Sequence, residues 1–559
     1  MVFRKCTECP LLCDKIPIVL RNFSRLLEFS LYQNIMFLLM KTYSLFGKIV
    51  DMKKVRRRVV FGFLFLSGFA FSESNLPSLL FGYLKNDLSL QKYTLTAQSK
   101  ALSYDASKIQ NGIELTLSTG TVKIQSSSEG SKYTFTPSAS LGLPQLNDTK
   151  LTASLPMTKK SGYELEGENG TFLDNGNVKL STGIVTSAPL KRKISLFEAE
   201  RAYIEAERAV QNQALSVENE FYTNLKSLYS YVQKVLSAKN DLYDDEIDLK
   251  VLTAQGYSKT SASYRRKYLE IQSDRRNVAE NLRMLERETA VFAVKCGAEY
   301  ERVFKPENFD RNKIAELENQ AFESVMAFLP AEIPGVEMED VLSYEAESYT
   351  KTENAVWSKY ISDLKRKSDY NLEVGAYAGY TFNESSSKYD TADGGITFDW
   401  HGITASAGVS LPTGQNLFPL NGTSAGQTSK SPVYTFALTL KPNTWRLAKL
   451  DRQQDELNAK IDEITVKSAA DDYDTAILDK LSERGNLKWS EKSYAEEYDM
   501  YSQLEYDMDN WLKQGSVTQS DYLDAANGRE KARMNQLINA VEKIIYNNNV
   551  KMMFVRNGK

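Results

Sequence analysis

Apolar residues recur at the spacing of an α-helix over long stretches of this sequence. Between Ala206 and Leu242, apolar positions follow one another in ten steps that span 36 residues, an average of 3.6. This is the period of an α-helix with one buried stripe. The pattern continues to Gly256, where the chain reverses, and returns to Cys296. At 1.5 Å per residue, a limb of about 55 residues would be about 80 Å long. The pattern therefore predicts a long helical hairpin.

A second hairpin of the same design is predicted near the carboxyl end. Gly515 interrupts the helical spacing as Gly256 does, each after a glutamine, and glycine relieves the steric cost of reversing the chain. The two glycines are 259 residues apart, and Pro189 and Pro442, which precede the two hairpins, are 253 residues apart. Such nearly equal offsets indicate an internal duplication.

Two other stretches alternate apolar and polar residues. Residues 111–188 and 369–441 are rich in Gly, Ser and Thr, and their period of two is typical of half-buried strands. Helical spacing over residues 86–108 and again over 341–368 predicts a short leading helix before each strand region. Each half of the chain therefore reads as helix, strands and helical hairpin, and the predicted fold class is α+β.

The strand regions suit a membrane barrel. Only helices and closed barrels cross a bilayer, because every backbone polar group there needs an internal partner. The segments are about ten residues long and carry aromatic residues at their ends, as barrel strands do. A soluble β-domain with an aromatic core is the alternative. About seven strand candidates are too few for a wide barrel in one copy, so we expect the strands to be shared between subunits.

A secretory signal is predicted at residues 52–72. Basic residues after Met52 precede an apolar core of 13 residues, Val59 to Phe71, and small residues follow. That core is too short for a transmembrane helix. We expect translation to begin at Met52, which makes residues 1–51 a doubtful upstream extension. Cys6, Cys9 and Cys13 could be metal ligands, but they lack a fourth partner nearby, and we expect them to belong to a discarded segment.

Composition argues against several function classes. Removal of residues 1–72 takes away 12 basic and 4 acidic side chains, so the formal net charge falls from −3 to −11, which disfavours nucleic-acid binding. The mature chain keeps only Cys296, and therefore no internal disulfide. His401 is the single histidine, which we place at a strand end beside Trp400. No motif for catalysis, a cofactor or a metal is present, so we predict that the protein is not an enzyme.

The turn of the second hairpin resembles that of the TolC-like outer-membrane efflux protein family, also called outer membrane factors. The matching residues are Leu512, Gly515 and the run Asp521-Tyr522-Leu523-Asp524-Ala525. The first hairpin keeps the glycine but lacks the acidic pair. As architecture, the resemblance extends from about residue 76 to residue 554.

This resemblance implies a membrane protein with two helix–strand–helix-hairpin repeats, at residues 73–304 and 305–559. Long antiparallel coiled-coil helices would form a trimeric periplasmic tunnel, and each protomer would give four strands to a shared transmembrane β-barrel of twelve. The implied location is the outer membrane, with a large periplasmic portion. The implied partners are a homotrimer, outer-membrane lipid, a periplasmic adaptor (membrane fusion) protein and an inner-membrane pump.

The acidic pair is the candidate gate. Asp521 and Asp524 are three residues apart and share one helix face. In a trimer they would form a ring of six carboxylates that favours cations, where the family has its periplasmic gate. The alternative is simple stabilisation of a helix start. The family's aromatic and arginine, which link the closed helices, are replaced here by Leu512 and Val517, although the adjacent Trp511 and Lys513 offer a substitute.

The two turns are the candidate docking surface for an adaptor. Their residues are Gly256, Tyr257 and Ser258 in the first turn and Gly515, Ser516 and Val517 in the second. The alternative is that small polar residues merely close each turn.

The function predicted from the sequence is the passive exit duct of a tripartite efflux pump or a type I secretion system. A periplasmic adaptor is one alternative, although it should carry a single hairpin. A coiled-coil structural protein of the envelope is another, although it would not need two strand-rich blocks at matching places.

Overall fold

The structure is a computed structural model that describes residues 75–128, 130–162, 170–173, 175–304, 314–369, 372–382, 389–414 and 431–555. The predicted signal at residues 52–72, the upstream extension and Cys6, Cys9 and Cys13 lie outside the described residues.

The described residues before position 334 form five helices. They are α4 (Asn75–Asn86), α5 (Leu88–Gln110), α6 (Ala188–Ala254), α7 (Ala262–Cys296) and α8 (Ile314–Phe328). Asp87 caps α5, since its side chain accepts a hydrogen bond from Leu90 N at 2.6 Å. The expected leading helix and both limbs of the first hairpin are thus present, and α6 alone is 67 residues long.

The second half contains α9 (Thr350–Ser368), α10 (Pro442–Lys513) and α11 (Gln519–Met553). The prediction of a helix over residues 341–368 was wrong for its first nine residues. Two short 3-10 turns, Val341–Ser343 and Ala346–Ser348, occupy that segment. The Ser343 and Ser348 hydroxyls donate to Asp340 O and Glu345 O at 2.7 Å, and such local bonds compete with a continuing helix.

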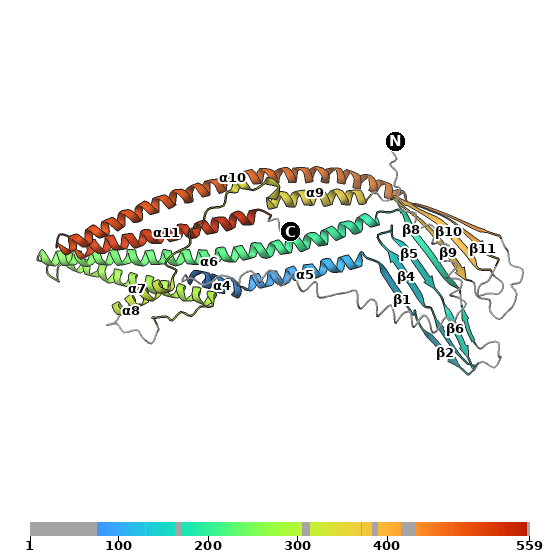
Figure 1. Ribbon diagram of the computed structural model, residues 1–559, viewed down its shortest axis with the longest axis horizontal. Coiled ribbons are helices and arrows are strands. Elements are labelled where there is room, and N and C mark those ends of the chain that lie inside the picture. The colour runs from blue at the N-terminus through green and yellow to red at the C-terminus, as the bar shows by residue number, and fades with distance from the viewer. Residues whose placement is uncertain are drawn as a thin grey trace. The chain divides into compact units, whose positions relative to one another are not determined.

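The helices pack around α6, and Figure 1 shows the two long hairpins running side by side. The predicted stripe of α6 is fully buried from Val217 to Ala238, where it meets α4, α7, α8 and α11. A smaller cluster joins the 3-10 turns to α10 and α11 through Val341, Tyr349 and Tyr546. No described helix has a stretch long and apolar enough to cross a membrane.

An eight-stranded sheet combines both halves of the chain. Its order is β1 (Glu114–Ser118), β4 (Ser138–Leu143), β5 (Thr149–Ser154), β8 (Gly176–Val185), β9 (Leu372–Phe382), β10 (Thr391–Trp400), β11 (Ile403–Pro412) and β12 (Val433–Leu440), with all neighbours antiparallel. Each half gives four strands. The eight strands of this sheet are twice the four per copy that the resemblance implies.

A second sheet of four strands continues the first-half strands. Its order is β2 (Lys123–Ser127), β3 (Gly130–Phe135), β6 (Met157–Ser161) and β7 (Gly170–Leu173). The pairs β1/β2, β3/β4, β5/β6 and β7/β8 are each consecutive in the chain, so four long strands are interrupted at one level. Pro137 and Pro156 lie in this break and have no N–H to give a ladder. Leu155 N still donates to Pro137 O across it at 3.0 Å. We call this level the crease.

Candidate functional site: two hairpin turns and a two-faced sheet

The first turn joins α6 to α7 through a left-handed glycine. Gly256 has φ +85°, with open space where a side chain would be, so the backbone conformation alone requires glycine. Tyr257 N donates to Leu252 O at 3.1 Å and closes the end of α6. Ser261 then caps α7 by accepting from Tyr264 N at 3.3 Å. Tyr257 is 46% exposed, so the turn presents an aromatic ring to solvent.

The second turn repeats this geometry and ends in a capping box. Gly515 has φ +72°, and Ser516 N donates to Trp511 O at 2.9 Å. The Thr518 side chain accepts from Asp521 N at 3.3 Å, while the Asp521 carboxylate accepts from Thr518 N at 2.8 Å. These bonds from Thr518 hold the pKa of Asp521 below its ordinary value. Asp521 therefore stabilises the start of α11, as the simpler interpretation expected.

Asp524 has a different partner. The Asn240 amide of α6 donates to Asp524, and Asn527 of α11 donates to Asn240. Nearby, Ser520 Oγ donates to Asp244 Oδ1 at 3.1 Å. These contacts join the end of the second hairpin to the first. Both Asp521 and Asp524 remain exposed. Lys513 forms an ion pair with Asp509 on its own helix.

A polar ladder extends these contacts along α6 and α11. Its members on α6 are Asn219, Lys226, Gln233 and Asn240, each seven residues after the last. Their partners on α11 are Asn549, Glu542, Asn535 and Asn527, and the measured distances include 2.9 Å for Asn219–Asn549 and 2.7 Å for Gln233–Asn535. The steps are seven residues on α6 and seven, seven and eight on α11, which is close to the heptad pattern of an antiparallel coiled coil. The ladder therefore fixes the register of one hairpin against the other.

A charged cluster lies between α6 and α7 near the first turn. Lys267 Nζ is 3.0 Å from carboxylate oxygens of Asp245, Asp248 and Glu270, and these contacts raise the pKa of Lys267. Asp274 adjoins the cluster. Burial and the carboxylate of Asp245 raise the pKa of Asp274.

One face of the eight-stranded sheet is apolar from edge to edge. Side chains alternate between the two faces of a strand, so partners in register share a face. One such row crosses all eight strands as Leu115, Leu141, Leu151, Leu180, Ala378, Gly394, Val409 and Tyr434. The apolar side chains on edge strand β12 are open to solvent, with Phe436 79% exposed and Leu438 67% exposed.

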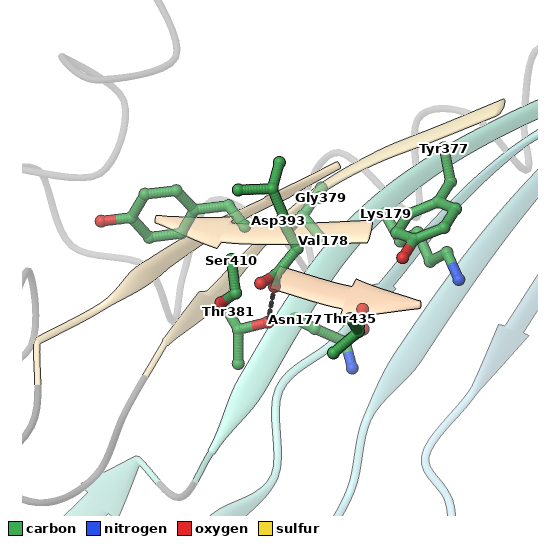
Figure 2. A pocket seen from close by; sticks show the side chains of 11 residues that line it. Asn177, Val178, Lys179, Tyr377, Gly379, Thr381, Asp393, Ser410 and Thr435 are labelled. Atoms are coloured by element: carbon green, nitrogen blue, oxygen red, sulfur yellow. Dashed lines mark hydrogen bonds between the residues drawn. The ribbon is translucent and has the colours of Figure 1, made fainter. Parts of the chain in front are cut away.

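The opposite face is polar. The next row reads Glu114, Gly142, Lys150, Ser181, Tyr377, Gly395, Gly408 and Thr435. Figure 2 shows a hollow on this part of the sheet, where Thr381 donates to Asp393 at 2.7 Å. The Lys179 Nζ atom lies 4.3 Å from the centre of the Tyr377 ring. The Tyr377 ring lies close over Gly395, where an added Cβ would be 2.7 Å from the ring.

Two family models match adjoining parts of this chain. The TP096X N-terminal domain matches residues 79–333, and the TP096X C-terminal domain matches residues 334–557. The chain belongs to the TP096X family. The two matches meet inside the irregular connector before the second leading helix. No curated protein matches the chain.

Several solved structures are similar to this TP096X chain. One is a membrane protein from Pseudomonas aeruginosa, with 13% identity, coverage of 86% of this chain and 89% of that chain, and a TM-score of 0.41. Another is the Campylobacter jejuni CmeC outer membrane channel, with 11% identity, 87% and 88% coverage, and a TM-score of 0.41. A third is the open state of the Neisseria gonorrhoeae MtrE outer membrane channel, with 11% identity, 86% and 88% coverage, and a TM-score of 0.39.

The structure of the TP096X chain adds residues that sequence reasoning missed. Arg201 of α6 has a side chain only 8% exposed and bonds to Glu353 and Asn354 of α9. It joins the first hairpin to the second leading helix. Asn240 was missed as well, although the seven-residue spacing of polar side chains on α6 is visible in the sequence. His401 lies, as predicted, at a strand end, in the two-residue turn between β10 and β11.

Proposed function

We propose that the protein is a passive outer-membrane channel, in which three copies form the exit duct of a tripartite efflux pump or a type I secretion system. The observation that carries the proposal is the two-faced sheet, whose edge strands β1 and β12 are each paired on one side only among the described residues. Water is a poor solvent for a continuous apolar face, and an open edge invites pairing with another chain. A bilayer covers the face, and neighbouring copies pair the edges.

The strand directions favour a closed ring. The eight strands alternate in direction, so the two edge strands β1 and β12 run in opposite directions. The β12 strand of one copy can therefore pair antiparallel with the β1 strand of the next. A trimer, the number that the family resemblance implies, would close twenty-four strands. An even number of antiparallel strands is the rule for single-chain bacterial barrels.

The helices beside the two edges support the same contact between copies. On α5, which leads into β1, the residues Leu88, Leu95, Leu102 and Ile109 are exposed at seven-residue intervals. On α10, which follows β12, an exposed apolar stripe is formed by Leu447, Leu450, Leu457, Ile461 and Ile464. Adjacent copies would place these stripes together, as knobs-into-holes packing requires.

The hairpin turns form the periplasmic entrance in this proposal. Asp521 and Asp524 supply an acidic ring that favours cations, and the turn residues Gly256–Ser258 and Gly515–Val517 contact a periplasmic adaptor. The adaptor connects the duct to an inner-membrane pump, which supplies the energy. Exposure of both aspartates and of Tyr257 supports these roles.

Single-channel recording in a planar bilayer tests the proposal. Discrete, cation-selective steps are expected, with lower selectivity in the variant Asp521→Asn/Asp524→Asn. The variant Asp471→Asn/Asp474→Asn is a matched control, because it removes two exposed carboxylates, also three residues apart, from the middle of α10. Steps unaffected by the first variant would keep the channel and move the acidic gate elsewhere. Folded trimers that never insert would refute the channel and favour a structural protein of the envelope.

A further inference from the structure

We propose that the four-stranded sheet beyond the crease is the outer part of the membrane wall, with lipid acyl chains covering its face that carries Phe135 and Met157. The proposal rests on the proposed function, since it requires a bilayer around the eight-stranded sheet. It assigns the extra strands of the first half to the membrane rather than to a water-soluble domain above it.

The apolar face crosses the crease without changing side. Along β3 and β4 the alternate residues are Tyr133, Phe135, Pro137, Ala139, Leu141 and Leu143. Along β5 and β6 they are Leu151, Ala153, Leu155 and Met157. The other side of the same strands carries Lys132, Thr134 and Ser140. Two neighbouring strands therefore keep one apolar and one polar face through the break.

The apolar band lies farther from the helices on β3 and β4 than on β12, although its helix-side end stays level across β9–β12, from Leu372 through Trp400 and Ile403 to Leu440. In register, Tyr434 of β12 is level with Leu141 of β4, six strands away. On β12 the band runs from Tyr434 toward the helices as far as Leu440. On β4 and β3 it runs from Leu143 to Tyr133, which lies eight residues past Leu141 in the opposite direction. Between β12 and β4, the end of the band away from the helices shifts by eight residues, and the end near the helices shifts by four. The mean shift is six residues over six strands, or about one residue per strand.

This shift is the one that tilted strands require. If the strands are tilted against the membrane normal, a band at one depth in the membrane meets each successive strand at a different residue. A shift of about one residue, or about 3.4 Å, over a strand spacing of about 4.8 Å corresponds to a tilt of about 35°. Membrane barrels have strands tilted by about 35–45°. The four-stranded sheet is thus the part of the wall that the first-half strands need in order to reach the far side of the bilayer.

The chemistry changes where the band ends. Tyr133 is paired with Lys159 on one side and with Ile124 on the other. Among the described residues, the next row on this face consists of the serines Ser126, Ser131 and Ser161. Tyrosine and lysine are favoured at the level of lipid headgroups, since each has an apolar body and a polar end. The row of Tyr133 and Lys159 marks that level.

Spin labels at single cysteines test the proposal. Cys296, the one cysteine of the predicted mature chain, is replaced by alanine. Phe135→Cys, Met157→Cys and Thr134→Cys are then compared with Phe436→Cys and Thr435→Cys in the mature trimer. The proteins are reconstituted into phosphatidylcholine vesicles. For each label, the collision rate with oxygen, which concentrates in lipid, is divided by the collision rate with a water-soluble nickel chelate to give an oxygen-to-nickel ratio. The expected oxygen-to-nickel ratio at 135, 157 and 436 is several-fold higher than at 134 and 435.

Positions 435 and 436 on β12 separate a failure of this inference from a failure of the proposed channel function. A high ratio at 436 with low ratios at 135 and 157 would overturn this inference and place the second sheet in water. A low ratio at 436 would overturn the proposed function together with it. Labelled protein that still forms conducting channels shows that the substitutions leave the fold intact, and two labelled positions beyond the crease guard against failure of one variant.

Discussion

The ladder between α6 and α11 predicts a strong energetic coupling between Gln233 and Asn535. Gln233 donates to Asn535 Oδ1 at 2.7 Å and to Lys531 O at 3.1 Å from a half-buried position. Replacing either residue alone by leucine removes their shared hydrogen bond, worth about 1 kcal/mol, and leaves a half-buried polar partner at a further cost of about 1 kcal/mol. We expect Asn535→Leu to lose about 2 kcal/mol, and Gln233→Leu to lose more, because it also removes the bond to Lys531 O.

The double variant Gln233→Leu/Asn535→Leu should lose much less. Both polar groups are then gone, and two leucines pack across the same seam, so the pair is nearly neutral. The expected coupling energy is about 2 kcal/mol or more, well above the additivity error of about 0.5 kcal/mol for independent sites. Thermal midpoints of the protein, followed by circular dichroism at fixed protein and detergent concentrations, measure it.

Gln211→Leu provides the matched control. Gln211 is an exposed glutamine of the same helix, and its replacement should change the midpoint little. If the double variant loses the sum of the two single losses, Gln233 and Asn535 act independently, and the ladder does not set the register of the hairpins.

Three further predictions concern the sheet and the turns. Gly395→Ala should destabilise the protein by about 1–3 kcal/mol in thermal melts, because the added Cβ would be 2.6 Å from the Ala407 carbonyl oxygen. Gly408→Ala should cost less, because the tightest contacts of its Cβ, at 2.8 Å, are the ends of the Thr435 and Tyr377 side chains. Equal losses in the two variants would contradict this reasoning. Asp274→Asn should stabilise the protein at neutral pH by about 0.5 kcal/mol, because the raised pKa of Asp274 makes its ionisation unfavourable in the folded state. This gain should vanish in melts below the ordinary carboxyl pKa, where the folded and unfolded chains are both protonated, and a gain that persists there would have another cause. Asp521→Asn should cost about 0.5 kcal/mol at neutral pH, the low end for a cap exposed to solvent, and the cost should disappear as the pH falls through the lowered pKa of Asp521. A cost independent of pH would mean that the carboxylate charge adds nothing to the capping box.

Periodicity predicted the long helices and their turns because few other structures give the same pattern. Gly256 and Gly515 were placed from sequence and both adopt positive φ. The segment at 341–349 was misjudged because two 3-10 turns with apolar residues imitate the spacing of one helical turn. Local side-chain bonds from Ser343 and Ser348, which the periodicity does not reveal, decide the difference.

The strand count could not be predicted because the crease looks like a set of loops. Pro137 and Pro156 read as strand ends, and only the register shows that the strands on either side continue one another. Partners of the candidate gate were also out of reach. Asn240 and Asp524 are 284 residues apart, and no local pattern in the sequence indicates that two residues so distant will meet.

The edge strand β12 has a consequence for biogenesis. A newly exported copy that has not yet met its neighbours would present Tyr434, Phe436 and Leu438 on a strand with a free backbone edge. Such a surface pairs with any exposed strand, its own kind included, in whatever register is offered. A soluble pool of finished monomers is therefore a hazard to the cell. In the proposed trimeric channel, folding of the sheet, trimer assembly and membrane insertion would have to be coupled in time, and a chaperone that shields this edge during transit would act on an aggregation-prone strand.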